Sequence, residues 1–313
     1  MSLQNGYFAS SVFALVSAGM LLYKKYKEIA SLGVLNLESA CGSATTDGLV
    51  VATRIHTSSA SNIAEVQKVA AFVVSALKYA SKVIVCIGFN SSQSNTADTV
   101  KDMSSYIEYL NRLNDHLFCN DHSIDKDRVV LLPIYPWGKF TTSLNCAILK
   151  AIDLKYEYIA FQSLEFRIPE ANVSQLFNCI AFNENVAVVG PAMQGHSYEY
   201  GNQILRGRTC PWNTFAIWSI KYVGKIGFPM IGDGSPTEGI SGGVEEVTTV
   251  ALLQKLYPNT IALLFKMENM EWQTNFTDPK RKAWHDEKMT SKDTRPDKQL
   301  HALGLPNAYV RHL

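Results

Sequence analysis

The chain has 313 residues, of which 47% are hydrophobic and 18% are charged. This balance is ordinary for a folded protein with a core, and the length allows about two domains or one α/β domain with two lobes. A formal net charge of +1 lacks the basic excess that nucleic-acid binding requires, so we expect no nucleic-acid partner. The six cysteines are scattered without a CxxC pair, which argues against a zinc site and a dense disulfide framework.

Residues 1–30 are expected to form an apolar N-terminal helix. Within it residues 7–23 carry no charge, and three lysines follow directly. A run of 17 residues is at the lower limit for a membrane-spanning helix, and the positive charges behind it would leave the main domain in the cytosol. The alternative is a helix packed on the domain, which the interrupting serines and Gly19 favour. We therefore expect a membrane-associated protein with a cytosolic domain and membrane contact through residues 7–23, or a cytoplasmic protein.

Short apolar, β-branched runs then alternate with amphipathic segments at helical spacing. The expected strands are residues 49–55, 82–89, 128–135 and 156–161, and the expected helices between them are residues 61–79, 99–117 and 142–154. Strands of five to eight residues that alternate with helices indicate right-handed βαβ units. The sequence therefore predicts an α/β domain whose first four strands are parallel and covered by helices on both faces.

The second half of the chain has weaker periodicity. We expect helices at residues 173–182, 220–225 and 244–256, strands at 186–189, 214–218 and 261–265, and an irregular segment at 192–213. Residues 232–243 contain five glycines and are interpreted as a loop long enough to act as a mobile lid, although a plain connector is the alternative. From residue 266 onward charge rises and periodicity vanishes, so residues 266–313 are expected to be a peripheral or partly disordered polar tail.

The sequence contains no Walker loop, no GxGxxG after a strand, no HExxH and no GxSxG. These absences exclude the simplest kinase, dehydrogenase, metalloprotease and α/β-hydrolase interpretations.

Candidate binding residues are those at the carboxyl ends of the expected strands, where ligands bind in open parallel sheets. They are Arg54 and His56 after the first strand, Asn90 and Ser91 after the second, Tyr135 and Trp137 after the third, and Gln162 to Glu165 after the fourth. The adjacent acids Glu245 and Glu246 follow the glycine-rich loop and are further candidates. Two acids in the first turn of a helix are also favoured by its macrodipole, without any function.

The run from Trp137 to Pro169 resembles the centre of a GT-A-type, family-two-like glycosyltransferase. That family has a loop glycine, then a helix that contains an asparagine, and then a strand that ends in Asp-x-Asp. Gly138, Asn145 and Ser163-Leu164-Glu165 have the same order and spacing here. The runs NVAVVGP (185–191) and NTFAIWSIKYVGKIGF (213–228) are similar to later segments of the family. GGVEEV (242–247) lies where the family keeps its catalytic acidic pair.

The resemblance implies a GT-A-like (Rossmann-like) mixed sheet over residues 48–265, with a nucleotide half at 48–165 and an acceptor half at 166–265. It implies an enzyme that moves a sugar from a nucleotide sugar, UDP- or GDP-linked, to an unknown acceptor hydroxyl, with inversion. Glu246 aligns with the general base and Glu245 with its neighbour. The macrodipole at the helix start predicts a lowered pKa for the Glu246 carboxyl group, which would then be ionised at neutral pH. The donor-binding residues that it implies are Arg54, His56, Asn90, Lys139, Ser163 and Glu165.

The sequence departs from the family at the metal site. Ser163 replaces the first aspartate of the Asp-x-Asp pair, so Glu165 is the remaining carboxylate for a Mn²⁺ or Mg²⁺ ion. We expect weak metal binding that needs the nucleotide diphosphate to complete the ligand shell. The helix arginine of the family is Leu144 here, and the base-binding aspartate is absent from the segment around Asn90.

Two alternatives remain open at this stage. A catalytically inactive, GT-A-like binding or scaffold protein would account for the substitutions at Ser163, Leu144 and Asn90. A nucleotidyltransferase would need a glycine-rich, basic loop after the first strand, and residues 56–62 (HTSSASN) contain neither glycine nor lysine.

Overall fold

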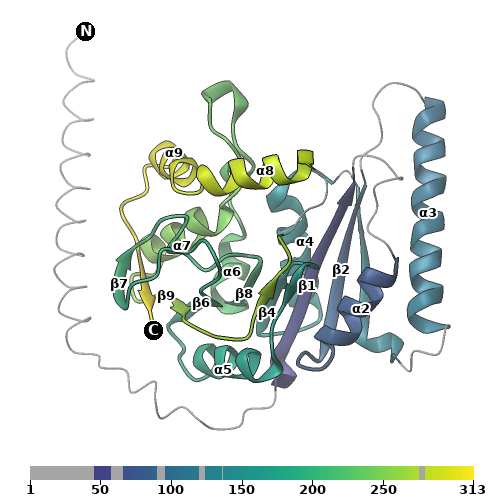
Figure 1. The fold of residues 1–313 in the computed structure, drawn as a ribbon, viewed down its shortest axis with the longest axis horizontal. Coiled ribbons are helices and arrows are strands. Elements are labelled where there is room, and N and C mark those ends of the chain that lie inside the picture. Colours follow the sequence, from purple (N-terminus) through teal and green to yellow (C-terminus); the bar gives the residue numbers. More distant parts are fainter. Residues whose placement is uncertain (1–45, 58–65, 90–95, 120–123, 136, 275–278) are drawn as a thin grey trace.

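The computed structural model describes residues 46–57, 66–89, 96–119, 124–135, 137–274 and 279–313 (Figure 1). The apolar segment at residues 7–23 and the candidates Asn90 and Ser91 lie outside these ranges. No helix among the described residues is long and apolar enough to cross a membrane.

Nine of the described strands form one sheet in the order β3-β2-β1-β4-β8-β6-β9-β11-β7. Their bounds are β1 (Leu49–Thr57), β2 (Lys82–Phe89), β3 (Val129–Ile134), β4 (Tyr158–Gln162), β6 (Val186–Pro191), β7 (Gly201–Ile204), β8 (Phe215–Ser219), β9 (Ile261–Phe265) and β11 (Tyr309–His312). The first four strands run parallel, β8 is antiparallel to both of its neighbours, and β7 is antiparallel to β11. The predicted mixed α/β sheet with parallel first strands is confirmed.

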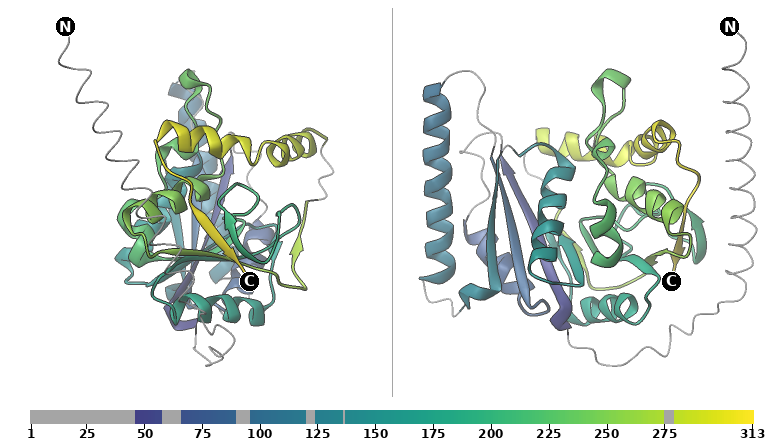
Figure 2. Two further views of the ribbon diagram at one scale, coloured as in Figure 1. Left: turned by 90° about the vertical axis from the view of Figure 1, so that its left-hand side faces the viewer. Right: turned by 180° about the vertical axis from the view of Figure 1, so that it is seen from behind.

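Helices cover both faces of this sheet (Figures 1 and 2). Their bounds are α2 (Val66–Ala76), α3 (Thr96–Phe118), α4 (Phe140–Asp153), α5 (Glu170–Ala181), α6 (Ile220–Ile226), α7 (Glu245–Leu256), α8 (Pro279–Thr290) and α9 (Thr294–Ala302). Buried side chains of α2, α3 and α5 share one apolar cluster, and those of α4, α6 and α7 share another. The sheet separates the two clusters, which gives three layers.

Short connecting elements complete the fold. They are the 3-10 turns η2 (Thr46–Gly48), η4 (Lys126–Arg128), η5 (Met230–Asp233) and η6 (Pro236–Glu238), and a two-stranded antiparallel ribbon of β5 (Phe166–Arg167) and β10 (Glu271–Trp272).

Strand β1 shows why the apolar runs become central strands. Leu49 and Val51 belong to one cluster, Val50 and Ala52 to the other, and all four side chains are fully buried. A strand that is buried on both faces needs an unbroken apolar run instead of an alternating one. Each buried leucine or valine side chain contributes roughly 1.5–3 kcal/mol to folding. These contributions fix the position at which Arg54 and His56 leave the sheet.

The C-terminal segment differs from its prediction. We expected residues 266–313 to be a peripheral or partly disordered tail, but β11 pairs parallel with β9 and antiparallel with β7 inside the main sheet. Helices α8 and α9 lie along the edge of the sheet to which the β1 arrow points (Figure 1). Their packing depends on a few buried polar residues, Arg295 and Gln299 among them, which an apolar periodicity cannot reveal. The segment predicted as irregular, 192–213, likewise contains β7.

Candidate functional site

Two adjacent carboxylates, Glu245 and Glu246, begin helix α7, and each residue is only 5% exposed. The chain enters this helix through two residues with positive φ, Gly243 at 96° and Val244 at 63°. A left-handed conformation is costly for valine, so the surrounding packing must impose it. The turn aims both glutamates inward instead of leaving them on the helix surface.

Glu245 joins the pair to the end of β1. The Nη1 atom of Arg54 lies 3.7 Å from Glu245 Oε1, and the same Nη1 donates a hydrogen bond of 3.2 Å to the carbonyl of Phe140. The Nδ2 of Asn213 donates to Glu245 Oε1 at 3.4 Å. Arg54 therefore connects β1, the start of α4 and the start of α7 at the carboxyl edge of the sheet.

Glu246 is held on one oxygen only. Its Oε1 accepts a 2.9 Å hydrogen bond from the backbone N–H of Asn213, whose Oδ1 accepts one from Trp218 Nε1 at 2.9 Å. Its Oε2 is buried and has no hydrogen-bond partner within the part of the chain that the structure describes. A buried carboxylate oxygen without a protein partner costs free energy unless a water molecule or a ligand meets it.

The environment of Glu246 raises the pKa of its carboxyl group. Burial is the largest cause, and the neighbouring Glu245 adds to it, while Lys292 and the hydrogen bond from Asn213 oppose it. We expected the macrodipole at the start of α7 to hold this pKa low, and that expectation is wrong. A full burial of the charge outweighs the partial charge of a helix terminus.

Three cations from the C-terminal segment face the two carboxylates, and none of them was predicted. They are Lys288 at the end of α8, Lys292 in the turn that follows, and Arg295 in α9, and each interacts electrostatically with Glu245 or Glu246. Burial lowers the pKa of Lys288 and of Lys292 to about 8. Their spacing of four and then three residues is typical of one helix face, but α8 ends at Thr290 and α9 begins at Thr294, so this spacing does not describe how the three residues are arranged.

Asp233 connects the glycine-rich loop to the start of α4. Its carboxylate accepts hydrogen bonds from the backbone N–H of Thr141 at 2.8 Å and from Thr141 Oγ1 at 2.6 Å. Lys139 Nζ donates to the Asp233 carbonyl at 3.3 Å. A carboxylate that accepts hydrogen bonds from the first turn of a helix is also favoured by the helix macrodipole. The predicted donor residue Lys139 is thereby placed beside the loop.

His196 fixes the segment between β6 and β8 against the site. Its Nδ1 accepts from the backbone N–H of Met193 at 2.8 Å, so Nε2 carries the proton that it shares with the Cys210 carbonyl at 3.0 Å. The ring stacks on Trp212 with centroids 3.6 Å apart. Burial lowers the pKa of His196 to about 3, so the imidazole is neutral in the folded protein.

The remaining predicted residues lie at the same edge of the sheet or outside the described chain. His56 is exposed at the end of β1, and its ring stacks on Trp137 with centroids 5.0 Å apart. Ser163 follows β4, and its backbone N–H donates to the carbonyl of Thr214, the residue after Asn213. Glu165 lies in the same turn, where its carbonyl accepts from the backbone N–H of Gln273. Asn90 is not among the described residues.

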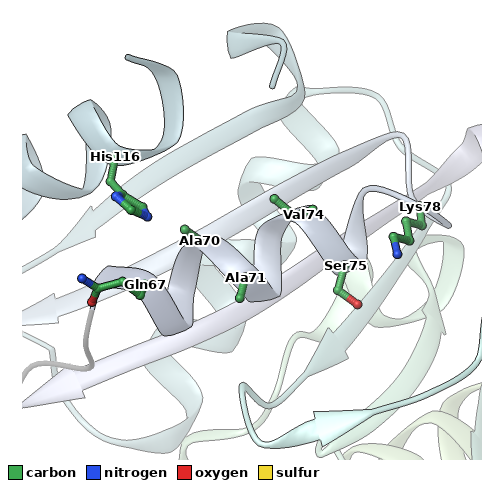
Figure 3. A pocket seen from close by; sticks show the side chains of 7 residues that line it. All are labelled: Gln67, Ala70, Ala71, Val74, Ser75, Lys78 and His116. Atoms are coloured by element: carbon green, nitrogen blue, oxygen red, sulfur yellow. The ribbon is translucent and has the colours of Figure 1, made fainter. Parts of the chain in front are cut away.

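The pocket in Figure 3 does not lie at the carboxyl edge of the sheet, where the acidic pair lies. No group of three or more His, Cys, Asp or Glu side chains among the described residues is arranged to hold a metal ion. The assignment of Glu165 as a metal ligand stays a prediction. The pocket, of about 410 Å³, belongs to the helix layer and is lined by Gln67, Ala70, Ala71, Val74, Ser75, Lys78 and His116.

No protein-family model and no curated protein matches this sequence. Distant likenesses exist among solved structures. The mannosyltransferase PcManGT from Pyrobaculum calidifontis, in complex with GDP-Man and Mn²⁺, is 12% identical with a TM-score of 0.40, and the match covers 76% of this chain but only 63% of that one. A mycobacterial protein is 13% identical with a TM-score of 0.45, over 88% of this chain and 80% of its own.

A third likeness is the 4-diphosphocytidyl-2C-methyl-D-erythritol synthase from Anaerococcus prevotii. It is 13% identical with a TM-score of 0.40, over 78% of this chain and 100% of its own. At these identities and TM-scores the likenesses assign no activity to this protein.

Proposed function

We propose that this protein transfers a sugar from a nucleotide-sugar donor to an acceptor hydroxyl, with Glu246 as the general base. The observation that carries the proposal is the buried acidic pair at the carboxyl edge of the sheet, with one Glu246 oxygen left without a partner. A base needs a free oxygen that can accept the proton of its substrate within hydrogen-bond distance.

The proposed reaction is a single in-line displacement. Glu246 takes the proton of the acceptor hydroxyl as that oxygen forms a bond to the anomeric carbon. The bond between the anomeric carbon and the phosphate oxygen breaks, and its electron pair leaves with the nucleoside diphosphate. The sugar is thereby inverted, the proton resides on Glu246, and no redox partner or additional reactant is required.

The raised pKa of Glu246 suits this role. A carboxylate with a raised pKa is a stronger base than an ordinary one, provided that it is ionised at the working pH. Lys292 and the hydrogen bond from Asn213 favour the ionised form, and Glu245 stays paired with Arg54. The pair thus divides its roles, with Glu245 binding Arg54 and Glu246 keeping an oxygen for the acceptor.

The donor would lie along the carboxyl edge of the sheet. We propose Arg54 and Lys139 as charges near the diphosphate and His56, stacked on Trp137, as a contact of the nucleoside. Ser163 and Glu165 in the turn after β4, together with Asn90, complete the proposed donor contacts.

The experiment that tests donor recognition is a melting-temperature screen with UDP-, GDP- and CMP-linked sugars. A ligand at a hundred times its dissociation constant adds about 2.7 kcal/mol to the free energy of unfolding. We expect one nucleotide class to raise the melting temperature of the wild type and to raise that of Arg54→Met less. Adenosine diphosphate ribose serves as a control for charge alone. If all of these nucleotides give the same shift, or none gives any, the proposed donor class is wrong.

A further inference from the structure

The main chain that leads into α7 is bound by two side chains of α9, which packs against α7 (Figure 1). Gln299 Nε2 donates hydrogen bonds to the carbonyl of Ser241 at 2.9 Å and to that of Gly243 at 3.0 Å. Arg295 Nη1 donates to the carbonyl between them, that of Gly242, at 2.9 Å. Both side chains belong to buried residues. Three successive carbonyls are therefore held by the C-terminal segment.

The beginning of the glycine-rich loop holds the same stretch of main chain. The backbone N–H of Gly243 donates to the carbonyl of Gly232 at 2.7 Å. A Cβ atom on Gly232 would lie 2.7 Å from the Cβ of Glu245, and one on Gly243 would lie 2.5 Å from Arg295 Nη1. These approaches are too close for a side chain, so both positions need glycine. The main chain before α7 is thus packed tightly between the loop and α9.

These contacts act on the turn that directs the acidic pair. Gly243 and Val244 have positive φ angles of 96° and 63°, and Glu245 and Glu246 follow directly. Valine adopts a left-handed conformation only where its surroundings impose it. The hydrogen bonds to the carbonyls of residues 241–243 fix the peptide planes that enter this turn, and they are the polar contacts that can impose it.

We infer that Gln299 and Arg295 are positioning residues for Glu246, because they hold the carbonyls of residues 241–243 and thereby keep the carboxylate directed inward. The inference rests on the proposed function for the role of Glu246 as the base. A displacement of about 1 Å at a reacting group can cost a hundredfold in rate, so the exact course of this turn matters to the reaction.

The charge state of Glu246 reports its position. The ionisable groups that face it among the described residues are Glu245, Cys210, Lys292 and Arg295. Burial is the largest cause of the raised pKa of Glu246. Gln299 carries no charge, so its replacement changes this pKa only through a change in the position or burial of the carboxylate. A turn that relaxes toward solvent lowers the pKa toward its ordinary value.

The test compares Gln299→Met with the wild type, because methionine keeps the length of the side chain and removes both donors. Carbon-13 NMR of glutamate-labelled protein follows the titration of Glu246, and Glu246→Gln assigns its signal. We expect a lower pKa of Glu246 in Gln299→Met, and a kcat for sugar transfer that is lower by about tenfold to a hundredfold. Gln299→Asn is one methylene shorter and cannot hold both carbonyls, so it should change both quantities in the same direction by less.

Two control variants separate positioning from a general loss of stability. Gln254 lies on α7 about two turns beyond Glu246. Its side chain also makes two hydrogen bonds to main chain of the C-terminal segment, with the N–H of Tyr309 at 2.9 Å and its carbonyl at 2.8 Å. Lys298, the neighbour of Gln299 on α9, donates instead to the carbonyl of Gly239 at 3.5 Å. Gln254→Met and Lys298→Met are expected to keep the wild-type pKa of Glu246 and the wild-type kcat.

An unchanged pKa of Glu246 in both Gln299 variants would overturn the inference, and so would an equal shift in Gln254→Met. The pKa measurement needs no sugar transfer, so the two hypotheses fail in different ways. If Gln299→Met lowers the pKa but the wild type transfers no sugar, only the proposed function is wrong. If the wild type transfers sugar through Glu246 and both Gln299 variants keep the wild-type pKa and kcat, only the inferred positioning is wrong.

Discussion

Replacement of Glu246 by glutamine is expected to lower sugar transfer by at least about a hundredfold, the usual contribution of a general base. Glutamine keeps the size of the side chain, and its oxygen can still accept the hydrogen bond from the Asn213 N–H. Folding and donor affinity should therefore stay near the wild type, and the loss should appear in kcat. The measurements are the transfer rate at saturating donor and the donor affinity of the same preparation.

Glu245→Gln is the control for this variant. It removes one carboxylate from the pair but leaves the free oxygen of Glu246, and it weakens the contact with Arg54 at 3.7 Å. We expect a loss mainly in donor affinity, hence in KM. If Glu246→Gln and Glu245→Gln both transfer sugar at the wild-type rate, neither carboxylate is the base. The inactive binding or scaffold protein then becomes the better account.

The free energy of unfolding is expected to fall as the pH is lowered, because His196 is held neutral in the folded protein. Its pKa in the folded protein is about 3, below the ordinary value of 6.5, because the buried ring is held neutral. Lys292 and His312 also face it and lower its pKa further. The unfolded chain takes up a proton near pH 6.5 and the folded chain does not. The stability is therefore complete above pH 6.5 and is lost progressively as the pH falls toward 3, by about 1.4 kcal/mol per pH unit.

The measurement is the free energy of unfolding in urea between pH 7 and pH 4.5. His196→Phe keeps a ring on Trp212 but cannot titrate, so its stability should be lower at pH 7 and fall less steeply toward acid. The lower stability of His196→Phe at pH 7 arises because the Met193 N–H and the Cys210 carbonyl lose their hydrogen-bond partner, which costs about 1–3 kcal/mol for each group. The exposed His301→Phe variant is the control and should keep the wild-type slope. An equal slope in His196→Phe would show that this ring is not the titrating group.

Most strands could be predicted because a strand that is buried on both faces has a continuous apolar run, and most helices because their apolar residues recur at helical spacing. Strand β2 was predicted with its observed bounds, Lys82–Phe89, since its apolar run is continuous and the residues on each side are polar. Strand β11 could not be predicted in the same way. It has four residues, alternates between buried and half-buried side chains, and owes its place in the sheet to its pairing with β9 and β7.

Arg54 could be predicted from its place at the end of a strand, because the topology of a parallel sheet brings strand ends to one edge. The acidic pair was predicted from its place after the glycine-rich loop and from the family resemblance. The cations at Lys288, Lys292 and Arg295 could not, since they follow a segment without apolar periodicity. The pKa of Glu246 was also predicted in the wrong direction. A helix start lowers a carboxyl pKa, but deep burial raises it by more, and the sequence does not show how deeply a side chain is buried.

The central claim is that this protein moves a sugar to a hydroxyl with release of a nucleoside diphosphate. The most direct measurement is mass spectrometry of reactions that contain the donor identified by melting temperature and a pool of hydroxyl acceptors. We predict that the wild type forms nucleoside diphosphate and a glycosylated acceptor in equal amounts, and that Glu246→Gln forms neither at a comparable rate. A bound donor that stays intact with every acceptor, or that breaks down equally fast in the variant, would contradict the account.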